Sequence, residues 1–139
     1  MPLLHVGAPA DRYAGLDLRA DGKTIVGVFD LGSNDTYMNV AAAKLLGIRQ
    51  STPHVHRVPR DSMTYFPGAG ENHEWVMTTG LVLTMGGQPL PDGPVEIFQT
   101  VNEINGDRTK PELDLGTDLM QDRILFISYS TNRVCLSPR

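Results

Sequence analysis

The sequence is poor in cysteine, in positive charge and in long apolar runs, and each shortage excludes a class of structure or partner. Cys135 is the only cysteine among 139 residues, so no disulfide can form within the chain, which suits a reducing compartment. Its place in an apolar stretch predicts a buried thiol. The net charge of −4, from 12 basic and 16 acidic side chains, indicates no surface for nucleic acid or an anionic membrane.

No apolar run approaches the length of a membrane span, and the first residues lack the basic and apolar regions of a secretion signal. A cytoplasmic protein is therefore expected, unless a leader or an anchor has been removed. Two common catalytic motifs are missing as well: a nucleophile elbow centred on serine, and a phosphate-binding glycine loop before a helix. The length predicts one domain, 1–139.

Short apolar stretches separated by turn residues predict a protein built mostly of β-strands. Asp21-Gly22 is the preferred pair for a tight hairpin turn and lies between two such stretches. The final pair of stretches flanks Ser130-Thr131-Asn132 and predicts a second hairpin. The expected strands are residues 16–19, 23–29, 74–85, 95–101, 124–129 and 133–136.

Residues 39–46 predict a short helix, because alanines and leucines recur there at helical spacing. Asn39 is the expected N-cap and Gly47 the residue that ends the helix. Together these elements indicate an all-β, mainly antiparallel domain, closed or folded over on itself, with one or two short helices.

The most informative point of the chain is the end of the strand at residues 23–29. Asp30 follows directly, and Gly32 allows the backbone to turn sharply. The carboxylate is then held at the end of a rigid strand, partly out of bulk water, as a reactive acid requires. The alternative is an ordinary aspartate-containing turn at the end of a strand.

Three segments of the chain resemble landmarks of one protein family. Residues 30–36, Asp-Leu-Gly-Ser-Asn-Asp-Thr, resemble the active-site loop of the retropepsins, the retroviral-type aspartic proteases, which reads Asp-Thr/Ser-Gly-Ala/Ser. Residues 39–48 resemble the short helix that follows this loop in bacterial and cellular relatives. Residues 115–120 resemble the second landmark, in which a glycine precedes a one-turn helix. The resemblance implies the closed β-barrel of an acid-protease half-fold.

The resemblance also implies an aspartic endopeptidase that acts as a homodimer on peptides or proteins and needs no cofactor. Such an enzyme uses two carboxyl groups that share a proton, one to activate a water and one to bind the peptide carbonyl. The chain offers one credible catalytic residue, Asp30, so its twin would come from a second copy. Gly32 keeps the turn, while Asn34 and Asp35 occupy positions that bind the backbone of an extended peptide in the family.

A further part of the peptide site is expected within residues 51–72, where retropepsins have a β-hairpin flap. Gly68-Ala69-Gly70 is interpreted as the flap tip, because glycines let backbone N–H groups approach a substrate and let the loop move. An ordinary surface loop is the alternative.

Two positions depart from the family pattern. Leu31 replaces the Thr or Ser whose hydroxyl braces the two loops across the dimer in the family. Either apolar contacts hold the loops instead, or the chain is a catalytically weakened or inactive module for dimerisation or peptide binding. Asp114 replaces an apolar residue and is expected to point to solvent or to line the cleft, where it would affect substrate choice. The rival arrangement is a catalytic pair formed by Asp30 and Asp114 of the same chain. A single lobe of this size is not expected to place both loops symmetrically, which disfavours this arrangement.

The histidines raise the question of a metal site. His54 and His56 would share one face of a strand at a spacing compatible with a metal, and His73 with Glu74 could add ligands. Four histidines without cysteine partners more often belong to a solvated loop. No metal site is therefore expected.

Overall fold

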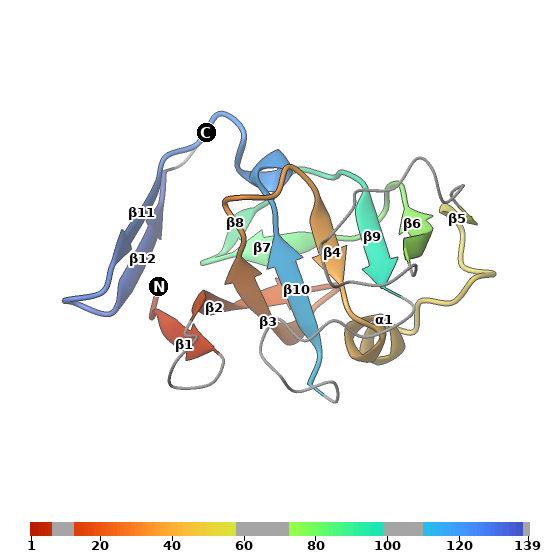
Figure 1. Ribbon diagram of the computed structural model, residues 1–139, viewed down its shortest axis with the longest axis horizontal. Coiled ribbons are helices and arrows are strands. Elements are labelled where there is room, and N and C mark those ends of the chain that lie inside the picture. Colours follow the sequence, from red (N-terminus) through yellow and green to blue (C-terminus); the bar gives the residue numbers. More distant parts are fainter. Residues whose placement is uncertain (7–12, 58–72, 99–109, 138–139) are drawn as a thin grey trace.

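The structure is a computed structural model that describes residues 1–6, 13–57, 73–98 and 110–137 (Figure 1). Within these ranges, short strands form one curled sheet and a separate two-stranded hairpin, and one α-helix and one single-turn 3-10 helix lie among the connections. The strands are β1 (Leu4–Val6), β2 (Tyr13–Ala20), β3 (Lys23–Phe29), β4 (Thr36–Met38), β5 (Val55–Arg57), β6 (His73–Met77), β7 (Leu83–Met85), β8 (Gln88–Pro89), β9 (Val95–Phe98), β10 (Glu112–Leu115), β11 (Leu125–Ser128) and β12 (Arg133–Leu136). The helices are α1 (Val40–Leu46) and the 3-10 helix η2 (Thr117–Met120).

The main sheet has the strand order β5-β6-β9-β4-β10-β3-β2-β7-β8, with β1 paired to β2. Two pairs in its centre are parallel, β3 with β10 and β4 with β9. The other pairs are antiparallel, so the prediction of a mainly antiparallel all-β fold is confirmed. Strand β10, which is distant in sequence, is parallel to β3 and antiparallel to β4. It therefore lies between the two strands that the Asp30 loop connects.

The first predicted hairpin is confirmed. Strands β2 and β3 pair from Gly15↔Val28 to Ala20↔Lys23. The turn residues Asp21 and Gly22 both have positive φ, 46° and 77°. A two-residue turn of this kind matches the right-handed twist of the strands that it joins.

The strand predicted at 74–85 is wrong in its extent, because two strands occupy this range. Strand β6 ends at Met77 and β7 begins at Leu83. Between them Gly80 has a φ of 94°, and its N–H donates to Asp92 Oδ1 at 2.9 Å. The Thr79 hydroxyl also donates to Asp92, and these hydrogen bonds lower the pKa of the Asp92 carboxyl. A side chain from a later segment thus stabilises the bend, which apolar periodicity alone does not reveal.

The predicted helix is confirmed with both of its caps. Asn39 Oδ1 accepts a hydrogen bond from Ala42 N at 2.8 Å, and Gly47 ends the helix with a φ of 75°. Asn39 Nδ2 also donates to Lys110 O at 2.8 Å. The N-cap therefore ties the start of α1 to the chain just before β10.

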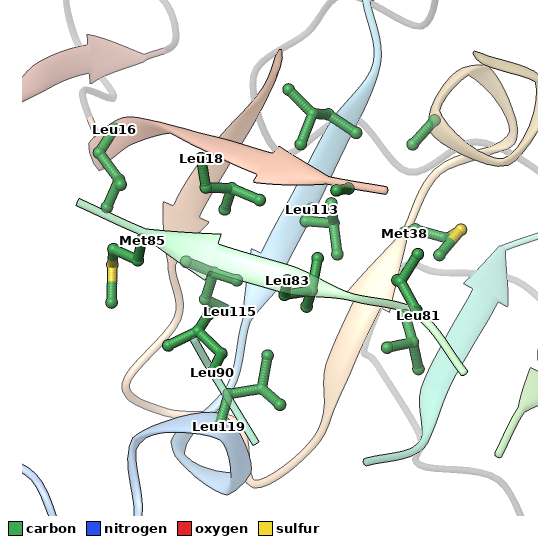
Figure 2. Close-up of a cluster of buried hydrophobic side chains, with 14 of the residues drawn as sticks. Leu16, Leu18, Met38, Leu81, Leu83, Met85, Leu90, Leu113, Leu115 and Leu119 are labelled. Carbon is green, nitrogen blue, oxygen red and sulfur yellow. The ribbon is translucent and has the colours of Figure 1, made fainter. Parts of the chain in front are cut away.

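Leucine and methionine side chains from both halves of the chain fill the core (Figure 2). Leu18, Leu113 and Leu115 are at most 1% exposed. A β-carbon at Gly27 would lie 2.3 Å from Leu18 Cδ2 and 3.0 Å from Leu115 Cδ1. Glycine at this position of β3 is what allows the two leucines to pack against the strand.

Strands β11 and β12 form the predicted C-terminal hairpin, which stands apart from the main sheet near the N-terminus (Figure 1). One of its faces packs on the core through Val134, which is fully buried, and through the partly buried Ile127. The other face carries Phe126 opposite Cys135. Cys135 is exposed, so the predicted buried thiol is wrong. The strand is apolar as expected, but the pleat turns this residue away from the core.

Helices long and apolar enough for a membrane span are absent from the part of the chain that the structure describes.

Candidate active site

Asp30 lies where the sequence places it, at the point where β3 opens into a tight turn. Its N–H donates to Leu115 O at 3.1 Å and so extends the β3–β10 pairing by one residue. Asp30 Oδ1 accepts from Gly32 N at 3.1 Å, and Ser33 N donates to the Asp30 carbonyl at 3.2 Å. One carboxylate oxygen is thus fixed by the turn, and the half-buried side chain is oriented by the backbone that follows it.

Hydrogen bonds fasten the Asp30 loop to the segment that begins at Gly116. Thr117 N donates to Ser33 O at 3.0 Å, and Asp118 N donates to Asn34 O at 3.2 Å. The two landmarks that the sequence singled out, residues 30–36 and 115–120, therefore meet in the fold. The predicted one-turn helix after Gly116 is confirmed as η2.

Thr36 joins the two segments from within the core. Its side chain is fully buried, donates to Asp118 Oδ1 at 2.7 Å and accepts from Gly116 N at 3.1 Å. Burial raises the pKa of the Asp118 carboxyl, and the hydrogen bond from Thr36 opposes that effect. Thr36 was not singled out from the sequence, although a threonine in a short, otherwise apolar strand is a signal for such a buried contact.

Ser33 holds the loop from inside and was also missed. Its hydroxyl donates to Asp35 O at 2.9 Å and accepts from Asp35 N at 3.2 Å. The same oxygen lies 3.4 Å from the hydroxyl of Tyr37, which is fully buried on β4. These contacts make the loop a rigid support for Asp30.

Asp114 is buried beside Asp30. The residue is 4% exposed and pairs with Val28 on one side and Tyr37 on the other. Burial and, to a smaller extent, the nearby carboxylates of Glu112 and Asp30 together raise the pKa of its carboxyl to about 8. The expectation that Asp114 points to solvent is wrong, because β10 runs through the centre of the sheet. Its expected contact with substrate, and the rival catalytic role, stay predictions.

A further acid near the loop was missed by the sequence analysis. Glu96 on β9 pairs with Tyr37, and partial burial together with the nearby Asp35 raises the pKa of its carboxyl to about 7. Residues 95–101 were expected only as a strand. Nothing in the local sequence indicates that Glu96 lies near Asp35, because the two residues are brought together by the parallel pairing of β9 with β4.

The remaining predicted site residues divide into two groups. Gly32, Asn34 and Asp35 lie in the loop with Asp30, and the first two are exposed. The interpreted flap tip, Gly68-Ala69-Gly70, lies outside the described residues. The binding roles of all six stay predictions.

The histidines do not have the geometry that was considered for a metal. His54 has a φ of 65° and precedes β5, so it does not share a strand face with His56. Within the described ranges, no three His, Cys, Asp or Glu side chains are grouped closely enough to hold a metal ion.

A pocket of about 390 Å³ lies between α1 and the edge of the sheet formed by β5 and β6. Its lining includes Lys44, Val55 and Trp75 but neither Asp30 nor Asp114. The pocket is therefore separate from the Asp30 loop.

No known family model matches this sequence, and no curated protein matches it. Among solved structures, the chain is similar to a retropepsin-like aspartic protease from Rickettsia conorii, with a TM-score of 0.60 and 12% sequence identity. The match covers 96% of this chain and 88% of that one. The retroviral protease-like domain of Ddi1 from Leishmania major matches 98% of this chain and 89% of its own, at 12% identity and a TM-score of 0.49. The likeness to the Rickettsia protein shows that this chain has the retropepsin-like, aspartic protease-type fold.

Proposed function

We propose that the protein is an aspartic endopeptidase that acts as a homodimer, with Asp30 of each chain as the catalytic residue. The observation that carries the proposal is the position of Asp30 at the end of a central strand, in a turn that fixes one carboxylate oxygen. Hydrogen bonds to η2 hold that turn. A retropepsin-like fold supports the assignment, because sites of this kind depend on the preorganisation of a carboxylate.

The proposed reaction needs the two Asp30 carboxyl groups to face each other and to share one proton. The ionised group accepts a proton from a water molecule, and the oxygen of that water attacks the peptide carbonyl. The protonated group donates a hydrogen bond to the carbonyl oxygen as negative charge develops there. The tetrahedral intermediate then breaks its C–N bond, with proton transfer to the leaving amine.

Exposed apolar side chains support the proposed dimer. Leu31, next to the catalytic residue, is 58% exposed, and Phe126 on the outer face of the β11–β12 hairpin is 60% exposed. Ile124, which directly precedes β11, is 74% exposed. Burial of such side chains against a second copy would stabilise the assembly that brings two Asp30 residues together.

A second candidate function is a non-catalytic module that uses the same fold for dimerisation or peptide binding. The observation that favours it is Leu31 itself. Leucine at this position has no hydroxyl to brace the loops, so the two carboxyl groups would be held less firmly.

Peptide cleavage by matched variants tests the proposal. The wild-type protein is incubated with a mixed peptide library from acid to neutral pH, and products are identified by mass spectrometry. Asp30→Asn is expected to abolish cleavage while the circular dichroism spectrum and the sedimentation coefficient stay unchanged. Asp17→Asn, an exposed aspartate on β2, is the control and should cleave like the wild type. Unchanged cleavage by Asp30→Asn would refute the role of Asp30, and no cleavage by the wild type would favour the non-catalytic module.

A further inference from the structure

The face of the sheet that carries Asp30 is acidic. Side chains alternate between the two faces of a strand, so Asp30 and Val28 belong to the same face at the end of β3. Val28 pairs with Asp114 on β10, and Asp114 pairs with Tyr37 on β4. Residues paired across neighbouring strands share a face. Asp30 and Asp114 therefore lie on one surface, and the effect of the Asp30 carboxylate on Asp114 agrees with this placement.

The series of paired residues Val28, Asp114 and Tyr37 continues across the sheet and adds further acids to this face. Tyr37 pairs with Glu96 on β9, so Glu96 belongs to the same face. Glu112 precedes Asp114 by two residues on β10 and shares that face as well. Figure 1 shows the four strands β3, β10, β4 and β9 side by side in this order.

The basic groups on this face of the described residues lie away from Asp114. On β2 the face carries Arg19 and, beside it, Asp17, which pair with Thr24 and Val26 of β3. Lys110 stands two residues before Glu112 and is exposed. His56 is the last residue of the series, because Glu96 pairs with Val76 and Val76 pairs with His56 on the edge strand β5. None of these basic groups lies beside Asp114, whose direct strand neighbours are Val28 and Tyr37.

The acidic face is distinct from the main hydrophobic core. Val28 and Tyr37 are both fully buried, yet neither belongs to the large apolar cluster on the other side of the sheet. Asp114 is 96% buried between them, and its Oδ1 has no hydrogen-bond partner among the described residues. A buried oxygen without a donor costs about 1–3 kcal/mol. A ligand that brings a donor to this point would recover that free energy.

We propose that Asp114 forms the base of a side-chain pocket beside Asp30 that binds a basic residue of the peptide substrate, lysine or arginine. The inference rests on the proposed function and names the substrate class of the same site. Cationic donors make the strongest hydrogen bonds to a carboxylate, and the surrounding acids favour a positive ligand over a neutral one.

The proposal gives binding a specific dependence on pH. In the free protein Asp114 is protonated below about pH 8, because burial and the neighbouring carboxylates raise its pKa. A bound ammonium or guanidinium group favours the ionised form, so binding releases a proton. Affinity for a basic peptide should therefore increase as the pH rises toward about 8, by up to about tenfold for each pH unit.

Two peptides that differ only in one ammonium group provide the test. Both are bound to the full-length Asp30→Asn protein, so that neither is cleaved, and fluorescence anisotropy measures the dissociation constants. The peptides share one sequence, with lysine in the first and norleucine in the second at one central residue. The lysine peptide is expected to bind at least about tenfold more tightly than the norleucine peptide near pH 8, because norleucine has the aliphatic stem of lysine but lacks its charge.

Variants in the same background locate the effect. Asp30→Asn/Asp114→Asn should lose the preference for lysine, whereas Asp30→Asn/Asp17→Asn should keep it. Equal affinity for the two peptides, a preference that survives Asp114→Asn, or no binding of either peptide would overturn the proposal. The comparison needs no catalysis, so a protein that never cleaves can still show the preference. A protease with no such preference would contradict only the inference about Asp114.

Discussion

The backbone of Asp35 crosses Gly116 so closely that a β-carbon on the glycine would lie 2.2 Å from the Asp35 carbonyl oxygen. The same β-carbon would lie 2.5 Å from the Asp35 carbonyl carbon, and atoms of a backbone cannot swing aside as the end of a side chain can. Gly116 has a φ of −74°, so its conformation suits any residue. Close packing, and not backbone freedom, therefore requires glycine where the Asp30 loop meets η2.

Gly116→Ala is expected to lower the free energy of unfolding by about 3 kcal/mol, because the loop and β10 must move apart to admit a methyl group. Chemical denaturation measures the change. Gly93→Ala is the matched control, since its β-carbon would meet only Leu119 Cδ2 at an ordinary 3.9 Å. Equal stability of the two variants would contradict the close contact at Gly116.

Local patterns in the sequence predicted the elements that depend on neighbouring residues. The Asp21-Gly22 hairpin, the helix capped by Asn39 and the turn after Asp30 each follow from residues within a few positions of one another. The order of the three family landmarks predicted the fold class. These features need no knowledge of which strands pair.

The parts that the sequence did not reveal depend on pairing between distant segments. Asp114 is buried because β10 inserts between β3 and β4, and Glu96 approaches Asp35 because β9 runs parallel to β4. The exposure of Cys135 depends on which face of the final hairpin meets the core. Alternation along a strand cannot decide which face is buried when both faces carry apolar residues.

The free energy of unfolding should decrease as the pH rises, and the decrease should be steeper in the wild type than in Asp114→Asn. The folded state holds the Asp114 proton up to about pH 8, whereas the unfolded chain releases it near the ordinary aspartate pKa of 3.8. Between these values the folded state binds more protons, so stability falls as the pH rises, by at most about 1.4 kcal/mol for each pH unit. Urea titrations of the wild type and of Asp114→Asn at several pH values measure the difference.

Glu96 and Asp118 also have raised pKa values, but both remain in the wild type and in the variant. The difference between the two pH profiles therefore reports Asp114. At about pH 8 Asp114→Asn should be the more stable protein, and the gap should close toward about pH 4. Parallel pH profiles would show that the Asp114 carboxyl titrates in the same way in the folded and unfolded chain.

Phe126→Glu is expected to weaken the proposed dimer by at least about a hundredfold in dissociation constant, because it places a charge on the exposed outer face of the β11–β12 hairpin. Analytical ultracentrifugation over a range of protein concentrations measures the change. The monomer should remain folded, since Phe126 is 60% exposed.

Val82→Glu serves as the control for Phe126→Glu. Val82 is 63% exposed but contacts the Asp21 turn, at the opposite end of β3 from Asp30. The control should associate like the wild type. If both variants associate normally, the hairpin face does not form the interface.

Leu31→Thr is expected to raise the cleavage rate of each dimer by about tenfold if the natural protein is a weakened protease. A threonine hydroxyl could make the bracing hydrogen bond that leucine cannot, and one such bond contributes about 1 kcal/mol or slightly more. The unfolding free energy of the monomer should change little, because Leu31 is 58% exposed. The rate is measured at protein concentrations well above the dimer dissociation constant, so that any loss of apolar contact between the loops does not mask the gain.

Leu31→Val, which is β-branched like threonine but lacks the hydroxyl, is the control and should not show the increase. A dimer that cleaves nothing with either residue at position 31 would instead identify the chain as a non-catalytic module with the retropepsin-like fold.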